Sequence, residues 1–157
     1  MKNQNTVEII PFEPNLKEHI KILNLEWLTK YFKVEEKDKL VLSSPQEEII
    51  DKGGMIFYAR YNNKIIGTFA LMKVDDTTFE LSKMAVSDDA QGLGIGNKLL
   101  IHCMAVAEEI GIKKVILYSN TKLLPAIHLY RKFGFIEVPL EGKIYERADI
   151  KMEKIIS

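Results

Sequence analysis

Apolar side chains near the start of the chain recur at the spacing of one helix face. They follow Pro14 at intervals of three or four residues: Leu16, Ile20, Leu23, Trp27 and Tyr31. Residues at this spacing share one side of a helix, and proline is common in a first turn, so the pattern predicts a helix over residues 14–31. A short strand is expected before it, over residues 6–11, and residues 1–5 are expected to be frayed.

A run of acidic and basic residues at 33–39 interrupts this helical pattern. Beyond it, the sequence Ser-Ser-Pro-Gln-Glu-Glu at 43–48 is typical of a helix start, because hydroxyl groups cap a first turn and acidic groups complement its dipole. We therefore expect a short helix that begins there and ends at Lys52, before two glycines.

The middle of the chain consists of apolar, β-branched and aromatic runs separated by turn residues. Two runs, 55–61 and 64–74, are joined by Asn62-Asn63, a pair that suits a two-residue hairpin turn. The turn Asp75-Asp76 leads into a third run, 78–86. Strands connected so closely pair antiparallel, so three antiparallel strands are expected here.

The second half of the chain alternates helical and strand patterns. The expected elements are helices at 97–110 and 125–133, and strands at 114–119, 135–139 and 145–153. A strand, a helix and a strand in succession form a crossover, which makes the strands at 78–86 and 114–119 parallel. The sequence thus predicts a single α+β domain over residues 1–157, with a mixed, mostly antiparallel central sheet flanked by helices.

Composition narrows the function classes. Lys plus Arg number 22 and Asp plus Glu number 22, so no net field favours nucleic acid or a membrane as partner. The polar start lacks the apolar core of a signal peptide, and no apolar stretch approaches the roughly 18 residues of a membrane span, so we expect a cytoplasmic protein. The lone Cys103 permits no internal disulfide, and the three histidines have no metal-binding spacing, so no metal is expected.

Three glycines, at 92, 94 and 96, lie between the strand at 78–86 and the next helix. Unpaired amides and the positive end of the helix dipole converge at such a place, and glycine lets an anion approach the main chain, so a pyrophosphate is the natural ligand. Two common nucleotide-binding loops, GxGxxG and GxxxxGKS/T, would both need glycine where Asn97 stands. The alternative is a tight turn that binds nothing.

The stretch Gln-Gly-Leu-Gly-Ile-Gly at 91–96 resembles the Q/R-x-x-G-x-G/A motif of the GNAT superfamily of acetyl-CoA-dependent N-acetyltransferases. The stretch AIHLYRKFGF at 126–135 resembles the helix ending A-xx-LY-xxx-GF of that family, and the strand ending at 84–86 is similar to its pantetheine-pairing strand. The expected order of elements agrees over nearly the whole chain. The resemblance implies a GNAT-like fold in which the parallel βαβ crossover carries the glycine loop.

The resemblance also implies acetyl-CoA as the acyl donor. The loop amides would hold its pyrophosphate with Gln91 at the entrance, and the strand would pair with pantetheine while one of its N–H groups faces the oxyanion. Asn120 would contact the cofactor from the end of the next strand, since Leu123 stands where many family members have asparagine; the alternative for Asn120 is to cap a turn. The expected cofactor-binding residues are Met84, Ala85, Val86, Gln91, Gly92, Leu93, Gly94, Ile95, Gly96, Asn97 and Asn120.

Acetylation of an amine needs a base, because an aliphatic ammonium has a pKa of about 10.4. Glu80 matches the glutamate that serves as base in the histone-acetylating branch of the family. Strict alternation would place it on the same side of its strand as Ser82, Met84 and Val86. The alternatives are a residue that positions water, a solvated side chain, or a partner for Lys83.

Tyr130 matches the family tyrosine that protonates the thiolate of CoA. Its alternative is an aromatic ring packed on the helix face with Leu129 or Phe133. Cys103 falls on the apolar face of its helix, which indicates a buried filler rather than a nucleophile. The acetyl group should therefore pass directly to the amine.

The acceptor is expected to lie against Tyr31 and Phe32 at the end of the first helix, near Trp27 and the acidic run at 35–38. The alternative is core aromatics beside a solvated charge run. The expected function is transfer of acetyl from acetyl-CoA to a primary amine, of a small molecule or a protein, in a ternary complex. A non-catalytic acyl-CoA sensor and an interaction module on the same fold are the rival functions, and the resemblance also allows a homodimer.

Overall fold

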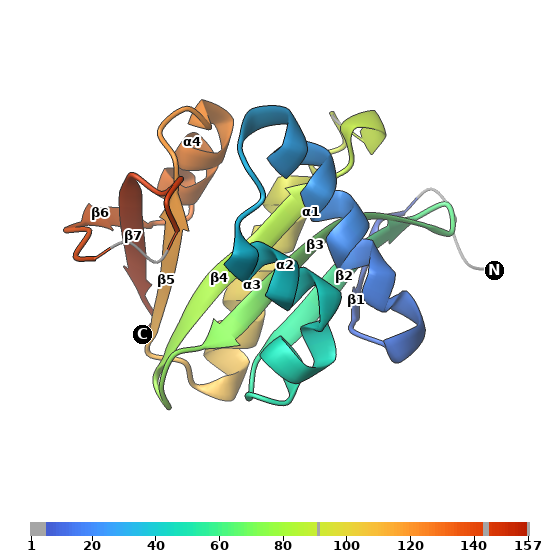
Figure 1. The fold of residues 1–157 in the computed structure, drawn as a ribbon. Helices are drawn as coiled ribbons and strands as arrows, with labels where there is room; N and C mark the ends of the chain where they lie inside the picture. The colour runs from blue at the N-terminus through green and yellow to red at the C-terminus, as the bar shows by residue number, and fades with distance from the viewer. Residues whose placement is uncertain (1–5, 91, 143–144, 157) are drawn as a thin grey trace.

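A central sheet organises the protein, for which the computed structural model describes residues 6–90, 92–142 and 145–156. Within these residues seven strands lie in the order β1-β2-β3-β4-β5-β7-β6 (Figure 1). The strands are β1 Glu8–Pro11, β2 Met55–Tyr61, β3 Lys64–Lys73, β4 Thr78–Val86, β5 Lys114–Ser119, β6 Ile136–Val138 and β7 Ile150–Ile155. Among the described strands β4 and β5 pair parallel and the other neighbours pair antiparallel, as the sequence predicts.

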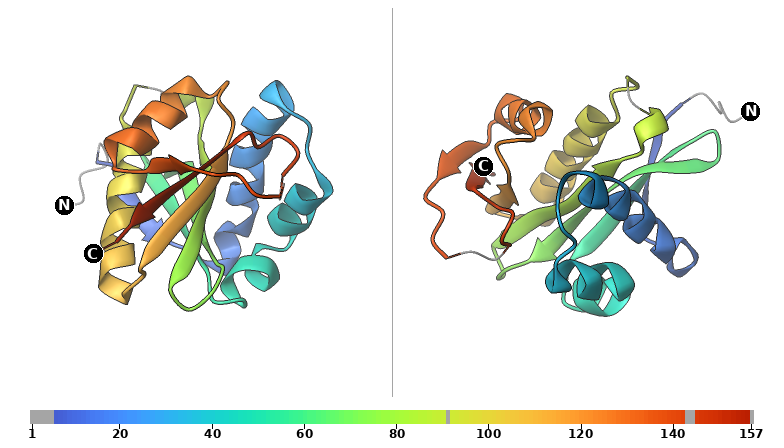
Figure 2. Two further views of the ribbon diagram at one scale, coloured as in Figure 1. Left: turned by 90° about the vertical axis from the view of Figure 1, so that its left-hand side faces the viewer. Right: turned by 45° about the horizontal axis from the view of Figure 1, so that its top comes forward.

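Helices cover both faces of the sheet, as Figure 2 shows. The four described helices are α1 Lys17–Tyr31, α2 Glu36–Ser43, α3 Ile95–Ile110 and α4 Leu124–Lys132. One apolar cluster joins α1 and α2 to inward residues of β2 and β3, and a second joins α3 and α4 to the opposite face. Short helical turns occupy Pro14–Leu16, Gln46–Ile50 and Asp88–Ala90. The fold is thus the α+β arrangement that the sequence predicts.

The predicted short helix after the charged run is present as the helical turn Gln46–Ile50. The sequence did not predict helix α2, which begins inside the charged run, at Glu36. The first turn of α2 is closed by Glu35 and Asp38, whose carboxylates bond the backbone amides of each other's residues. One alternative for the charge run was that its residues are solvated. In the structure Glu35 and Asp38 cap a helix instead, and Asp38 is fully buried.

The predicted strand at 145–153 is also partly wrong. Strand β7 begins at Ile150, and the residues from 145 to 149 turn back toward α2 instead. The backbone amides of Glu146 and Arg147 donate to the carboxylate of Glu35 at 3.0 and 3.3 Å. These contacts replace the hydrogen bonds of a ladder and hold the segment against the helical layer.

A bulge in β4 reverses its alternation. Thr68 of β3 is opposite Ala85 and Ala70 is opposite Ser82, so β4 has one extra residue, and Lys83 has a positive φ of 53°. Met84 therefore packs, together with Val86, on the α3 side of the sheet. The expectation that Met84 and Val86 share a side with Glu80 and Ser82 is wrong, because the bulge intervenes.

Candidate active site

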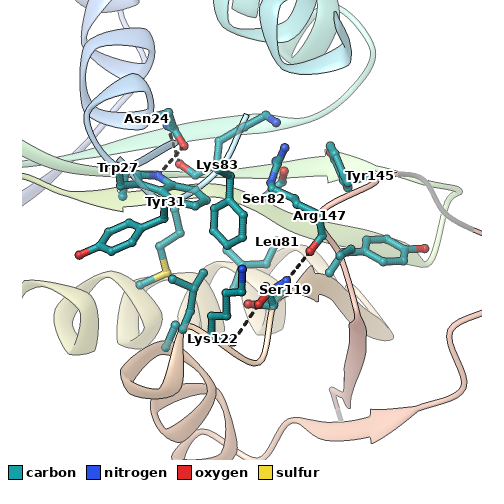
Figure 3. A pocket seen from close by; sticks show the side chains of 18 of the residues that line it. Asn24, Trp27, Tyr31, Leu81, Ser82, Lys83, Ser119, Lys122, Tyr145 and Arg147 are labelled. Carbon is teal, nitrogen blue, oxygen red and sulfur yellow. Dashed lines mark hydrogen bonds between the residues drawn. The ribbon is translucent and has the colours of Figure 1, made fainter. Parts of the chain in front are cut away.

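A cavity of about 740 Å³ opens where β4 and β5 part. Their ladder ends at the pair Glu80 and Ile116, and beyond it the strands diverge. The ends of α1 and α4 and the segment 145–148 complete the walls. Figure 3 shows Trp27 and Tyr31 at one end of the cavity, and Tyr145 and Arg147 at the other. Of the sequence-predicted site residues, the walls include Tyr31, Phe32, Glu80, Met84, Ala85, Val86, Asn120 and Tyr130.

Glu80 is a buried carboxylate in this wall, 6% exposed. Burial raises its pKa above the ordinary value, and the nearby charges of Lys37 and Lys83 oppose the rise. The hydroxyl of Tyr145 donates to its Oε2 at 3.4 Å. A carboxylate that holds its proton more tightly than usual is better matched to accepting one from an amine near neutral pH, which is a property of general bases.

Tyr130 reaches the cavity from α4, with its ring edge-on to Phe135 at 6.0 Å. Burial, and the proximity of Cys103, raise the pKa of its phenol to about 12. The hydroxyl thus stays protonated throughout the neutral range and can donate. The ring of Tyr130 packs on the apolar cluster, and the residue also lines the cavity, so its packing is compatible with the predicted role as proton donor.

Two glycines of the loop leave open space around the main chain. Gly92 and Gly94 have φ angles of 87° and 68°, and a Cβ added at either would meet no atom within 4 Å. These conformations favour glycine, and Gly94 immediately precedes the first turn of α3, whose leading amides have no partner within the helix. The geometry is that of an anion site at a helix N-terminus.

Gly96 has a different role from the other two glycines. A Cβ there would lie 3.1 Å from Leu129 and 3.6 Å from Met84, so its absence lets α4 and β4 approach α3 closely. The side-chain oxygen of Asn97 accepts a hydrogen bond from Lys132 at 2.9 Å, which ties the first turn of α3 to the end of α4. Gln91, expected at the loop entrance, lies outside the described residues.

Asn120 lines the cavity, but its side-chain amide is engaged at both ends. It donates to the carbonyl of Arg147 at 2.7 Å and accepts from the amide of Lys122 at 2.8 Å. The bond from Lys122 is the contact of the turn-capping alternative, whereas the bond to Arg147 joins the end of β5 to the segment 145–148. Leu123, at the position where the family often has asparagine, also lines the cavity.

Aromatic rings form the wall at the end of α1. The ring of Phe32 lies edge-on to Trp27 at 5.9 Å, and the Lys122 ammonium lies 5.9 Å from its centroid. Tyr31 is 56% exposed. The ion pair of Lys30 with Asp88, at 3.7 Å, joins this end of α1 to the segment after β4.

Lys83, Tyr145 and Arg147 are among the charged and polar cavity residues that the sequence did not predict as site residues. They meet around Asp38, which lies behind the wall rather than in it. Asp38 binds Lys83 at 2.7 Å and Arg147 at 2.6 Å. The expectation of an acidic wall at 35–38 is therefore wrong for Asp38, since two cations already neutralise it. Strand alternation gives no hint of these contacts, which join residues 45 and 109 positions apart.

The described residues contain no group of three or more His, Cys, Asp or Glu side chains arranged for a metal ion. None of their helices is both long and apolar enough to span a bilayer.

Comparison with known proteins gives partial matches in sequence and full-length matches in fold. A mycothiol acetyltransferase of Cellulomonas flavigena is 36% identical over 62 residues, which is 40% of this chain and 18% of that protein. The chain thus spans about a fifth of that relative's length. A GNAT-family acetyltransferase from Staphylococcus aureus Mu50 has a TM-score of 0.86 at 23% identity, over 97% of this chain and 100% of that one.

A second solved structure of this fold contains a ligand. PaiA N-acetyltransferase from Thermoplasma acidophilum, in complex with coenzyme A, has a TM-score of 0.75 at 20% identity, over 96% of this chain and 99% of that one. A model of the acetyltransferase (GNAT) family matches residues 20–135, which is most of the chain and includes Glu80, the glycine loop and Tyr130. With this match, and with a sheet that parts at the cavity, the chain belongs to the GNAT family of acetyltransferases.

Proposed function

We propose that the protein transfers the acetyl group of acetyl-CoA to a primary amine by direct attack in a ternary complex. The observation that carries the proposal is that Glu80 of β4 and Tyr130 of α4 line one cavity, whose wall residue Met84 lies next to Gly96 of the glycine loop. Glu80 is a carboxylate with a raised pKa and Tyr130 a phenol that stays protonated. That pair supplies the base and the acid of the reaction.

The glycine loop supports CoA as the donor. Its open main chain at Gly92 and Gly94 and the N-terminus of α3 suit a pyrophosphate. Met84 touches both regions, because it lines the cavity and lies next to the space that a Cβ on Gly96 would occupy. A donor held by the loop would therefore extend along β4 into the cavity, and PaiA, of the same fold, binds coenzyme A.

Each residue then has one task. When bound, acetyl-CoA supplies a thioester carbonyl as the electrophile. Glu80 accepts a proton from the ammonium, directly or through water, and so frees the lone pair that attacks. Backbone groups of β4 beyond Glu80 have no partner on β5, and those that are bound neither by β3 nor, at the Lys83 carbonyl, by Asn24 can bind the donor. Tyr130 donates the proton that the departing thiolate takes, and the second proton, which the attacking nitrogen loses on becoming an amide, restores the phenol through solvent.

Calorimetric titration with acetyl-CoA tests the proposal first. Gly94→Glu should abolish binding, because it puts bulk and negative charge where the pyrophosphate is expected. Gly111→Glu is the matched control, since Gly111 ends the same helix with a φ of 78° and also has open space around it. Equal loss in both variants would indicate backbone strain alone.

An amine screen completes the test, with release of free CoA as the readout. Binding of acetyl-CoA without amine-dependent release, for every amine tried, would support the sensor alternative. No binding by the wild-type protein would contradict the proposal at its first step and leave the interaction module.

A further inference from the structure

Asp38 connects three chain segments around the cavity. It is 0% exposed, and both carboxylate oxygens are fully used. Oδ1 accepts hydrogen bonds from Lys83 at 2.7 Å and Arg147 at 2.9 Å, while Oδ2 accepts from Arg147 at 2.6 Å and from the backbone amide of Glu35 at 3.0 Å. One side chain of α2 thereby holds β4 and the segment 145–148 in fixed relation.

On the β4 side, the contact point is the bulge itself. Lys83 has a left-handed backbone, which is unfavourable for a residue other than glycine and persists only where the surroundings fix it. Its side chain is held by Asp38, and its carbonyl accepts from the buried amide of Asn24 at 3.0 Å. Helices α1 and α2 therefore each hold one end of the same residue, and Figure 3 shows Asn24 and Lys83 side by side.

Both cations that bind Asp38 also lie near Tyr145, which contacts Glu80. The guanidinium of Arg147 lies 4.8 Å from the ring centroid of Tyr145, and the ammonium of Lys83 lies 5.0 Å from it. The hydroxyl of Tyr145 in turn donates to Glu80. The two cations bound by Asp38 thus also contact the ring that orients the carboxylate.

A buried ion pair is weak evidence for stability, because desolvation offsets most of its attraction. Its geometry is the stronger evidence, because Lys83 lies just beyond Glu80, where the ladder between β4 and β5 ends. We infer that Asp38 is a positioning residue, which holds the β4 bulge and the segment 145–148 so that the donor and Glu80 meet in register. This inference rests on the proposed acetyl transfer.

Lys83→Met is the principal test, because methionine keeps the buried stem and leaves Asp38 paired with Arg147. We expect kcat to fall on the order of 10²-fold, the cost of about 1 Å of misplacement, while the calorimetric Kd for acetyl-CoA stays within about twofold. The control is Lys73→Met, on the neighbouring strand, whose ion pair with Asp76 at 3.2 Å is exposed. It should change neither quantity.

Asp38→Asn is the second variant. It keeps the size of the side chain and removes the charge that pairs with Lys83 and Arg147, so it should show the same split between kcat and Kd even if Lys83→Met does not fold. Amide hydrogen exchange over residues 81–86, measured without ligand, should rise in both variants and not in Lys73→Met.

The outcomes separate this role from the function on which it rests. If the wild type turns over and both variants match its kcat, Asp38 has no positioning role and acetyl transfer stands. If kcat and acetyl-CoA binding fall together, the contacts only maintain the fold, and the inference is also overturned. If the wild type releases no CoA with any amine, acetyl transfer fails, and the exchange over residues 81–86 decides alone whether these contacts hold the bulge.

Discussion

The hydroxyl of Tyr145 donates to the carboxylate of Glu80 across 3.4 Å, although the two residues are 65 positions apart. Both are buried in the cavity wall. Burial raises the pKa of Glu80, and hydrogen bonds to its carboxylate, from Tyr145 among others, limit that rise. Tyr145 therefore adjusts the acidity of the proposed base without having to touch the substrate.

Tyr145→Phe should move the acidic limb of the pH profile of kcat/KM to higher pH. Without the hydrogen bond the charged form of Glu80 is less favoured, so its pKa rises further and the base is deprotonated only at higher pH. Glu80→Gln should lower the rate most between the pKa of Glu80 and that of the amine, where the wild-type base is charged and the amine still carries its proton. Tyr61→Phe, on the distant hairpin, is the control. If the acidic limb of the kcat/KM profile lies at the same pH in Tyr145→Phe and in the wild type, that limb does not arise from the ionisation of Glu80.

Tyr130→Phe should separate chemistry from binding. The change removes one hydroxyl and keeps the ring against Phe135, so the packing of α4 should survive. We expect kcat to fall on the order of 10²-fold, as for loss of a general acid, with little change in acetyl-CoA affinity. Steady-state kinetics with calorimetry measures both. An unchanged kcat would leave Tyr130 with its packing role only.

Cys103→Ser should retain turnover, because Cys103 is 0% exposed in the core and burial raises the pKa of its thiol to about 12. A buried thiol without access to the thiolate form does not act as a nucleophile. We expect no labelling of the folded wild type by iodoacetamide and no acetylated enzyme by mass spectrometry. An acetyl group found on Cys103 during turnover would replace direct transfer with a two-step route.

Local sequence signals located most of the fold. The boundaries of β2, β4 and β5 match the prediction, because apolar runs bounded by turn residues define them within a few positions. The hairpin turn Asn62-Asn63 has the expected positive φ angles of 50° and 62°. Glycines also mark both ends of α3, since Gly94 precedes its first residue and Gly111 follows its last.

The parts that the sequence did not predict depend on distant contacts. The sequence pattern predicts that residues 145–149 belong to the last strand. In the structure, hydrogen bonds to the carboxylate of Glu35 hold this segment outside the sheet. The bulge at Lys83 is invisible to alternation, because a lysine in the left-handed region is stabilised by Asn24 and Asp38 and not by its own preference. Glu80 and Tyr130 could be matched to a motif, whereas the residues that hold their surroundings could not.

The carboxylate of Asp38 makes the stability of the fold sensitive to acid. Burial alone would raise the pKa of Asp38, but the hydrogen bond from Arg147 and the charge of Lys83 outweigh it and hold the pKa at about 2, against 3.8 in the unfolded chain. A depressed pKa stabilises the fold above pH 4, and this contribution is lost as the pH falls from about 4 toward 2. At 1.36 kcal/mol per pKa unit it amounts to about 2 kcal/mol.

Urea unfolding of the wild type and Asp38→Asn, at pH 7 and at pH 3, measures this contribution. Asparagine does not titrate, so the free-energy gap between the two proteins should be largest at pH 7 and should narrow at pH 3, where protonation of Asp38 begins to remove the wild type's advantage. Asp76→Asn, which loses only an exposed ion pair, should show a small gap at both pH values. A gap for Asp38→Asn that stays constant with pH would mean that the carboxylate stabilises the fold by packing and not by charge. In that case the contacts of Lys83 and Arg147 would be held by something other than the ion pairs.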